Sequence, residues 1–287
     1  MVAQSVVQLF FNPASGSFCP LRLNALASAL RAEGADVIAT PSIDAVPVVA
    51  DRATHVCIAG GDGTVRHVAA NMARTGRMLP AAIYPAGTVN LLAREGGFQR
   101  SPGACARDLL HGREDQPFHP VALDETMFFA CASAGPDSAA VARLSKALKR
   151  RIGRLAYVAA FCEVLWRWPR PRLRLVADGG REIACEAVYI AKGRYFAGPW
   201  SFAPRASVTD RLLHVVALPR ARRRDYLGFL RTLLTGRDPA RDRRLVSFTC
   251  TRLAIHNDEG FPLQADGDIV ATRSVELAIR SAPILFR

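Results

Sequence analysis

The chain has 287 residues, of which 50% are hydrophobic, and a formal net charge of +13. That length suits one large domain or two ordinary ones, and the composition argues against a disordered chain. Seven scattered cysteines without a Cys-x-x-Cys pair argue against a structural zinc site and favour reduced thiols in a cytoplasm. The longest apolar run, at 156–166, is shorter than the roughly 20 residues that span a bilayer. We therefore expect a soluble or peripheral protein whose positive charge attracts anionic partners.

The first half of the chain alternates predicted strands with predicted helices. Apolar runs predict strands at 6–11, 36–40, 55–59 and 81–84, and apolar residues at helical spacing predict helices at 21–33, 46–52, 65–75 and 91–95. Residues 1–11 lack a basic segment and a cleavage site, so we interpret them as a strand and not as a signal peptide. This alternation predicts a parallel sheet with helices on both faces.

Three of these strands run into polar turns, which begin at Asn12, Gly60 and Gly87. The carboxyl ends of parallel strands meet at one edge of the sheet, where ligands bind. The middle turn, Gly60-Gly61-Asp62-Gly63-Thr64, presents backbone N–H groups at a helix start to an anion. Asp62 suits a phosphate site if a divalent cation or a reacting hydroxyl lies between them. The alternative interpretation is a tight turn capped by Asp62 or Thr64.

From about residue 119 short β-like runs predominate. They lie at 127–132, 172–177, 187–191, 212–218, 245–251, 253–256 and 275–279, with helices predicted at 139–150 and 222–234. This pattern predicts a second, mainly β domain. Two basic segments, at 146–154 and 222–244, are interpreted as solvated faces that also contact anionic lipid, at about 1 kcal/mol per basic residue.

Several segments, taken in order, resemble one family. They are 12–16 (Asn-Pro-x-Ser-Gly), 60–64, 85–90 (Pro-x-Gly-Thr-x-Asn), 135–138 (Gly-Pro-Asp-Ser), 149–157, 203–210 and 264–268 (Gln-Ala-Asp-Gly-Asp). Together they are similar to the diacylglycerol kinase catalytic-domain family, which includes bacterial soluble lipid kinases and sphingosine kinases. The resemblance implies an ATP-dependent kinase of a lipid hydroxyl. Its fold would be a phosphofructokinase/NAD-kinase-like α/β domain at 1–122 and a sandwich-like β domain at 123–278, with a last strand at 279–287 that returns to the first domain.

The same resemblance implies roles for individual residues. ATP binding is implied for Asn12, Thr40, Gly60, Gly61, Asp62, Gly63, Thr64, Val65, Arg66, Gly87, Thr88 and Asn90. Asp268 or Asp266 would take the proton of the lipid hydroxyl or orient the group that does, Asp62 would act with Mg²⁺, and Asp137 would contact the substrate. These parts meet the needs of phosphoryl transfer, whereas a plain hairpin turn is the alternative at 266–268.

A structural Mg²⁺ is also implied, held by the backbone carbonyls of Ser207 and Leu212 and by the carboxylate of Asp210. The chain departs from the family pattern in several places: Arg66 replaces Asn, Leu91 replaces Asp, Thr209-Asp210-Arg211 replaces Asp-Asp-Gly and Asp268 replaces Glu. A catalytically weakened lipid- or nucleotide-binding regulator is therefore one alternative. An NAD kinase, which shares the 60–64 turn, is another, and the high charge suggests a nucleic-acid-binding protein as a third.

The resemblance sets the expected partners. We expect ATP, Mg²⁺ and a lipid substrate met at a membrane surface by a cytoplasmic, peripherally associated protein, with no nucleic acid bound. The oligomeric state is left open, a homodimer included, and the sequence does not name the lipid.

Overall fold

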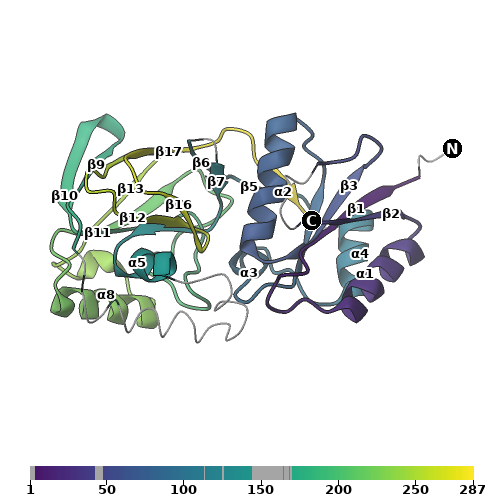
Figure 1. The fold of residues 1–287 in the computed structure, drawn as a ribbon, viewed down its shortest axis with the longest axis horizontal. Coiled ribbons are helices and arrows are strands. Elements are labelled where there is room, and N and C mark those ends of the chain that lie inside the picture. Colours follow the sequence, from purple (N-terminus) through teal and green to yellow (C-terminus); the bar gives the residue numbers. More distant parts are fainter. Residues whose placement is uncertain are drawn as a thin grey trace. The chain divides into compact units, whose positions relative to one another are not determined.

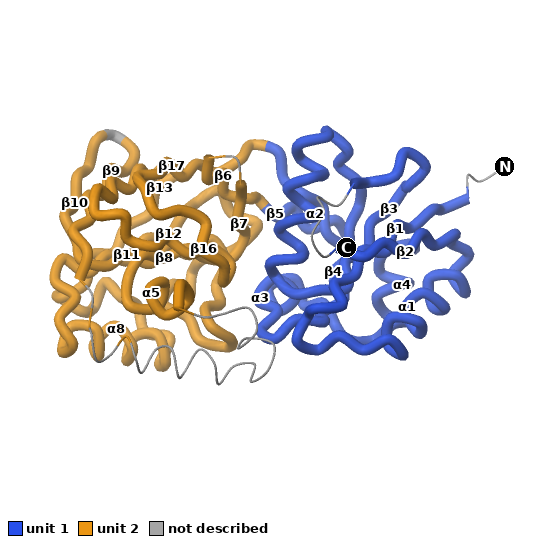
Figure 2. The backbone as a smooth tube through the Cα atoms, in the orientation of Figure 1, with its two compact units in different colours: residues 1–118, 282–287 blue, residues 119–281 orange. Residues whose placement is uncertain are grey.

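The computed structural model describes residues 4–42, 48–112, 114–124, 126–143, 164, 168 and 170–287. It divides into two compact units (Figure 2), unit 1 with residues 1–118 and 282–287 and unit 2 with residues 119–281. Unit 1 ends before residue 122 because 121–123 pair with a strand of unit 2. No helix among the residues described is long and apolar enough to cross a membrane.

Unit 1 is built on one sheet with the strand order β2-β1-β3-β4-β18-β5 (Figure 1). The strands are β1 (Val6–Phe11), β2 (Asp36–Pro41), β3 (His55–Gly60), β4 (Ala81–Pro85), β5 (Gln116–Phe118) and β18 (Ile284–Phe286). Neighbours from β2 to β18 pair in parallel, and β5 pairs with β18 in the antiparallel sense. The last strand of the chain thus belongs to the sheet of unit 1.

Helices cover both faces of this sheet. They are α1 (Pro20–Ala32), α2 (Asp62–Thr75), α3 (Leu91–Glu95) and α4 (Pro102–Arg107), followed by a π-helical turn at Asp108–Gly112. Leu26 and Leu30 of α1 and Cys105 of α4 pack on Leu9 and Cys57 of the sheet. Helix α2 packs on β3 with its own apolar side. The carboxyl ends of β1, β3 and β4 are left to the loops.

Two helix predictions in unit 1 need correction. The helix expected at 46–52 is absent from 48–52, because the side chain of Gln8 takes the backbone hydrogen bonds that a helix would need. Its Nε2 donates to the Val48 carbonyl at 3.1 Å and its Oε1 accepts from the Ala50 N–H at 2.7 Å. Helix α2 begins at Asp62 and not at residue 65, so three residues of the glycine turn form its first turn.

Unit 2 contains two six-stranded sheets among its described residues, and every strand pairing in them is antiparallel. The first holds β6 (Val121–Leu123), β7 (Thr126–Phe128), β9 (Leu173–Ala177), β10 (Arg181–Cys185), β14 (Arg252–His256) and β17 (Val275–Ile279). The second holds β8 (Cys131–Ala134), β11 (Ala187–Ala191), β12 (Leu213–Leu218), β13 (Val246–Cys250), β15 (Leu263–Ala265) and β16 (Asp268–Ala271).

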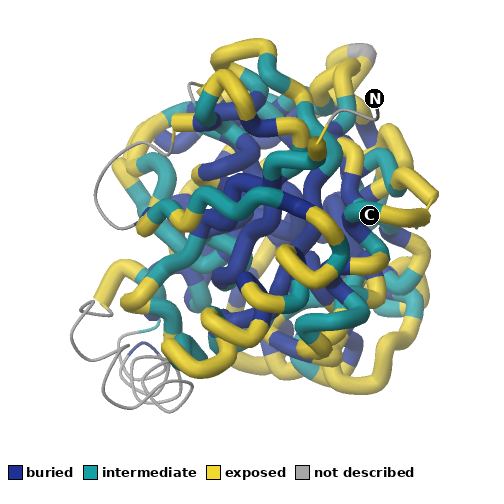
Figure 3. Tube along the Cα trace, turned by 90° about the vertical axis from the view of Figure 1, so that its right-hand side faces the viewer, coloured by how far each residue is buried: buried dark blue, intermediate teal, exposed yellow. Residues whose placement is uncertain are grey.

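The alternation of side chains explains how these sheets pack. Strand β12 turns Leu213, Val215 and Ala217 into the core between the two sheets, and Val216 and Leu218 toward helix α8 (Arg223–Thr235) on the outer face. Helix α5 (Pro136–Arg143) packs on β8, β15 and β16. Figure 3 shows the buried stretches of the chain in the interior and the exposed stretches mostly around the outside. The predicted fold class, a parallel-sheet α/β unit followed by a mainly β, sandwich-like unit, is confirmed.

The prediction of a helix at 139–150 is met up to Arg143 by α5, which begins earlier, at Pro136. The rest of that helix, the basic segment at 146–154 and the motif at 149–157 lie outside the described residues.

Candidate functional site

The loops after β1, β3 and β4 are joined to one another at the carboxyl edge of the sheet. The Ala86 N–H donates to the Gly60 carbonyl at 3.0 Å, and the Ser17 N–H donates to the Ala86 carbonyl at 3.0 Å. The Asn12 N–H donates to the Ala59 carbonyl at 3.2 Å, and its side-chain Nδ2 donates to Thr64 Oγ1 at 3.3 Å. The structure therefore brings the three predicted turns into one cluster.

Glycine is required where two of these loops touch. A Cβ on Gly87 would lie 2.4 Å from the Cα of Gly61, and one on Gly61 would lie 3.1 Å from the Cα of Gly87. A Cβ on Gly16 would lie 2.5 Å from Thr88 Oγ1. These contacts are with backbone or a short side chain, which cannot move aside, so the loops reach this packing because they lack side chains.

The N-terminus of α2 lies in this cluster and has no side-chain cap. Gly61 is its N-cap in an extended conformation (φ −95°, ψ −177°), and the Val65 N–H makes the first helical bond, to the Gly61 carbonyl. The N–H groups of the first turn and the helix dipole favour an anion at such an end. Gly63 and Thr64 lie in this first turn, at an end of the helix that favours an anion.

Asp62 ties α2 to α3. Its Oδ2 accepts from the Leu91 N–H at 3.0 Å and its Oδ1 accepts from the Leu92 N–H at 2.9 Å. Asn90, the N-cap of α3, has a left-handed backbone (φ 55°) and bonds back to the N–H and carbonyl of Gly87. Leu91, where the family has an acid, contributes its backbone to this arrangement while its side chain is buried.

Three other residues predicted to bind ATP have side chains that are buried or already hydrogen-bonded within unit 1. Thr40, near the end of β2, accepts a hydrogen bond from Gln8 Nε2 at 3.0 Å. The side chains of Val65 and Arg66 are buried in α2. Neither side chain therefore faces a ligand over the glycine turn, and the Val65 N–H already bonds to the Gly61 carbonyl.

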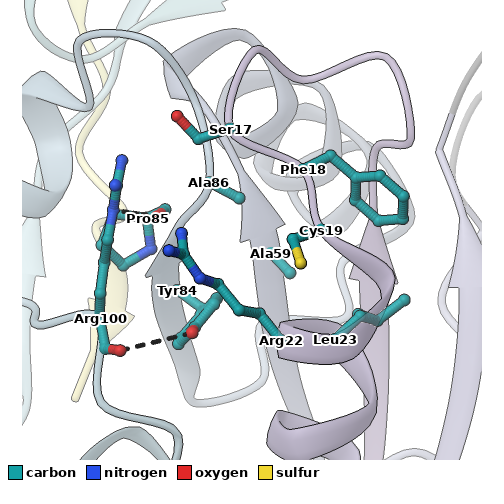
Figure 4. A pocket seen from close by; sticks show the side chains of 10 residues that line it. All are labelled: Ser17, Phe18, Cys19, Arg22, Leu23, Ala59, Tyr84, Pro85, Ala86 and Arg100. Atoms are coloured by element: carbon teal, nitrogen blue, oxygen red, sulfur yellow. Dashed lines mark hydrogen bonds between the residues drawn. The ribbon is translucent and has the colours of Figure 1, made fainter.

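A pocket beside these loops contains two arginines that sequence reasoning missed (Figure 4). It is lined by Ser17, Phe18, Cys19, Arg22, Leu23, Ala59, Tyr84, Pro85, Ala86 and Arg100. Arg100 Nε donates to the Pro85 carbonyl at 2.9 Å, and Tyr84 Oη donates to the Arg100 carbonyl at 3.4 Å. A backbone hydrogen bond from Arg22 lowers the pKa of the Cys19 thiol, and burial raises the pKa of Tyr84. No motif spacing marks Arg22 or Arg100, because only the fold brings them to the loop after β4.

In unit 2, Asp266 is a structural anchor. Its Oδ2 accepts from the Phe129 N–H at 2.9 Å, and its Oδ1 accepts from the N–H groups of Ala130 and Cys131 at 2.9 and 3.1 Å. The residue is 8% exposed and has a left-handed backbone (φ 47°). Both oxygens of Asp266 thus bond to the backbone where the chain enters β8, at 129–131.

Asp268 begins β16 on the half-exposed end of the same turn. A series of hydrogen bonds between side chains connects this turn to α5. The Gly267 N–H donates to Gln264 Oε1 at 3.0 Å, Gln264 Nε2 donates to Ser133 Oγ at 2.7 Å, and Ser133 Oγ donates to Asp137 Oδ2. This series leads from the Asp268 turn to the N-terminal turn of α5.

Asp137 lies at the inner end of that series. Its Oδ1 is buried. Burial raises the pKa of its carboxyl group, although hydrogen bonds from Ser133 and Tyr189 oppose the rise. The structure therefore places Asp137 behind the Asp268 turn, where it supports the turn's position.

The residues predicted to hold a structural metal do not fit one. The Nζ of Lys192 donates to the Ser207 carbonyl at 2.8 Å and to the Val208 carbonyl at 2.9 Å, and Lys192 is fully buried. A divalent ion about 4 Å from this ammonium would be repelled by roughly 8 kcal/mol near a protein surface. Asp210 and Leu212 are exposed, and no group of three His, Cys, Asp or Glu in the described chain could hold a metal.

The predicted residues thus form groups within each unit. Asn12, Gly60–Thr64, Gly87, Thr88 and Asn90 meet at the loops of unit 1, and Asp137, Asp266 and Asp268 are linked in unit 2. Sequence reasoning missed Lys192, Gln264 and Ser133 as supports. Gln264 belongs to the motif at 264–268, but its hydrogen-bond partner Ser133 lies 131 positions away, so the motif alone does not reveal its role.

Comparison with known proteins gives matches along most of the chain. Residues 6–117 match the model of the diacylglycerol kinase catalytic domain, and residues 130–285 match that of the YegS C-terminal NAD kinase beta sandwich-like domain. A Pseudomonas aeruginosa protein named "Probable lipid kinase YegS-like" is 32% identical over 230 residues, which are 77% of this chain and 72% of that protein. A diacylglycerol kinase of Mycobacterium tuberculosis is 28% identical over 282 residues, 93% of this chain and 90% of that protein.

Solved structures share the fold. The crystal structure of a diacylglycerol kinase from Bacillus anthracis superposes with a TM-score of 0.73 at 16% identity, over 99% of this chain and 96% of that one. At this level of identity the similarity concerns the fold alone.

Proposed function

Because the chain belongs to the diacylglycerol kinase catalytic-domain family, a family of lipid kinases, we propose that it transfers the γ-phosphate of ATP to the hydroxyl group of a lipid alcohol of the diacylglycerol type. The observation that carries the proposal is the cluster of three loops around the uncapped N-terminus of α2. There, glycine lets the backbone approach a phosphate, and the helix end attracts its charge.

The loops of unit 1 would bind and orient the triphosphate. The N–H groups of Gly63 and Thr64 would face its oxygens, and the Asn12–Thr64 hydrogen bond would hold the loop after β1 against them. Asp62 would serve as a carboxylate ligand of an ATP-bound Mg²⁺, a hard cation that prefers oxygen ligands, and its two bonds to the start of α3 would fix its position. Mg²⁺ bound with ATP would offset the negative charge of the phosphate oxygens.

Asp268 would take the proton of the lipid hydroxyl. A carboxylate placed within hydrogen-bond reach of an alcohol can orient it and accept its proton as the phosphate bond forms. Asp266, with both oxygens bonded to backbone N–H groups, would keep the turn in place. Asp268 is one methylene shorter than the glutamate of the family pattern, so the turn must bring the backbone itself closer to the substrate.

The test is transfer of labelled phosphate. The full chain is incubated with γ-labelled ATP and Mg²⁺, and separately with diacylglycerol, a sphingoid base, phosphatidylglycerol and NAD. We expect label in a lipid product and none with Asp62→Asn, whose folded state is checked by circular dichroism. Formation of NADP would overturn the lipid assignment in favour of NAD kinase. ATP binding without transfer to any lipid would favour the nucleotide-binding regulator.

A further inference from the structure

The outer side of α8 combines charge with exposed apolar side chains. Arg224, Leu227, Arg231 and Leu234 follow one another at intervals of three and four residues, so they form one stripe along the helix. Leu227 is 65% and Leu234 58% exposed, and both arginines are exposed. The opposite side of the helix packs Tyr226, Phe229 and Leu233 into the core of unit 2. The stripe is therefore the solvent side of a helix that is otherwise well packed.

A tryptophan extends this surface. The Ser201 N–H donates to the Leu233 carbonyl at 3.3 Å, which places the 200–201 loop beside the last turn of α8. Trp200 in that loop is 41% exposed. Tryptophan and leucine beside arginine are the residues by which amphipathic helices enter the boundary between lipid headgroups and acyl chains.

The charge around α8 has one sign. Residues 219–245 contain nine arginines and three aspartates. Asp225 is buried and lies 3.9 Å from the still exposed Arg224, Asp238 pairs with Arg205, and Asp242 pairs with Arg244, so the acids add little negative charge to the surface. Arginines also precede and begin α8, whereas none stands in its last turn. This is the reverse of what the helix dipole favours, so the arrangement is not explained by helix stability.

We propose that the α8 stripe, Arg224, Leu227, Arg231 and Leu234 together with Trp200, binds the anionic face of a lipid bilayer. The leucines and the tryptophan insert among the headgroups, and the arginines contact lipid phosphates. This inference rests on the proposed lipid-kinase function, because an enzyme that phosphorylates a lipid hydroxyl must reach its substrate at a membrane. Vesicle binding is nevertheless measured without turnover, so the two proposals can fail separately.

The experiment is sedimentation of the full chain with vesicles of phosphatidylcholine alone or mixed with phosphatidylglycerol. The wild type should bind the mixed vesicles more strongly, and salt should weaken that binding. Each arginine removed in Arg224→Gln/Arg231→Gln should lower the partition coefficient about fivefold. Leu227→Asp/Leu234→Asp should lower it at least about tenfold. Leu21→Asp and Arg31→Gln, exposed positions on α1 of unit 1, are matched controls that should bind as the wild type does.

The outcomes decide the proposal. Equal binding by wild type and stripe variants would overturn it, as would equal binding to both kinds of vesicle. Salt-sensitive retention on duplex DNA without retention on vesicles would overturn it in favour of a nucleic acid. Turnover of a short-chain, detergent-dispersed diacylglycerol should be unchanged in the stripe variants. Loss of that turnover would show damage beyond the surface and would also contradict the proposal.

A different observation concerns the loop at 207–212. Lys192 is one of three lysines among 38 basic residues, and it is fully buried. Its ammonium donates to the Ser207 and Val208 carbonyls, and its own backbone N–H is anchored to the Ala130 carbonyl at 2.9 Å. A compact ammonium with several donors suits converging carbonyls better than the planar guanidinium that this chain uses elsewhere. We infer that Lys192 supplies the positive charge that holds this loop, in place of a bound divalent ion.

Thermal unfolding without nucleotide tests this role. The melting temperature of the wild type should be the same in EDTA and in Mg²⁺. Lys192→Met removes the ammonium bonds to the Ser207 and Val208 carbonyls, each of which keeps one backbone N–H donor, and leaves the loop without its positive charge. It should lower the melting temperature by several degrees, with a partial, saturable recovery in Mg²⁺. A wild type that is stabilised by Mg²⁺ or destabilised by EDTA would overturn the inference. So would a Lys192→Met variant as stable as the wild type.

Discussion

Units 1 and 2 hold their polar turns by different means. In unit 1 the loops touch backbone to backbone, with glycine against glycine at residues 61 and 87 and carbonyl–amide bonds between the loops, and side chains such as Asp62 add further bonds. In unit 2 the Asp268 turn is held by side chains, through Gln264 to Ser133 and through Asp266 to three backbone N–H groups. Unit 1 should therefore be most sensitive to added atoms, and unit 2 to lost polar atoms.

The largest effect is expected from Gly87→Ala. The new Cβ would lie 2.4 Å from the Cα of Gly61, so the loops after β3 and β4 must separate. We expect ATP affinity to fall at least about 100-fold and the free energy of unfolding to fall by about 3 kcal/mol. Calorimetric titration with ATP and urea unfolding measure both quantities. Gly103→Ala is the matched control, because its Cβ would meet only the flexible end of Arg107, at 3.3 Å. Unchanged ATP affinity in Gly87→Ala would contradict the loop packing described.

The corresponding change in unit 2 is Asp266→Asn. The amide would turn a donor toward one of three backbone N–H groups and leave it unpaired. We expect the free energy of unfolding to fall by about 2–3 kcal/mol. Asp258→Asn, an exposed loop position in the same unit, should change it by less than about 0.5 kcal/mol. If urea unfolding gave equal values for the two variants, the anchoring role of Asp266 would be refuted.

A smaller, pH-dependent effect is expected from Asp137→Asn. Burial raises the pKa of Asp137 above its ordinary value of 3.8, so the folded state binds this proton more tightly than the unfolded state. Its contribution to stability is therefore full at low pH and is lost as the pH rises through the folded pKa. Because asparagine does not titrate, the variant should gain on the wild type by up to about 1.4 kcal/mol per pH unit in that window. Parallel stability profiles across pH would mean that Asp137 is not the titrating group.

The contrast between the units also explains what could be predicted from sequence. The strands and glycine turns of unit 1 follow from local apolar runs and from residue types next to them, so the cluster of turns at residues 12, 60 and 87 was foreseeable. The role of Asp62 in holding α3 was not, because its partners lie about 30 positions away.

In unit 2 the decisive contacts are still more distant in sequence. Asp266 lies more than 130 positions from the backbone N–H groups that it accepts from. Nothing in the sequence around Lys192 distinguishes it from another lysine at the end of a strand; only the fold shows that its ammonium donates to the 207 and 208 carbonyls. Motif spacing pointed to Asp266 and Asp268 together. Only the hydrogen bonds show that Asp266 is an anchoring carboxylate, which leaves Asp268 for the proposed reactive role.

The central claim is tested most directly by Asp268→Asn in the transfer of labelled γ-phosphate from ATP to lipid. The wild type should label a lipid. The variant should bind ATP and unfold in urea as the wild type does, while its transfer rate falls at least about 100-fold. Transfer by the variant at the wild-type rate, or a wild type that binds ATP and labels no lipid, would contradict the account.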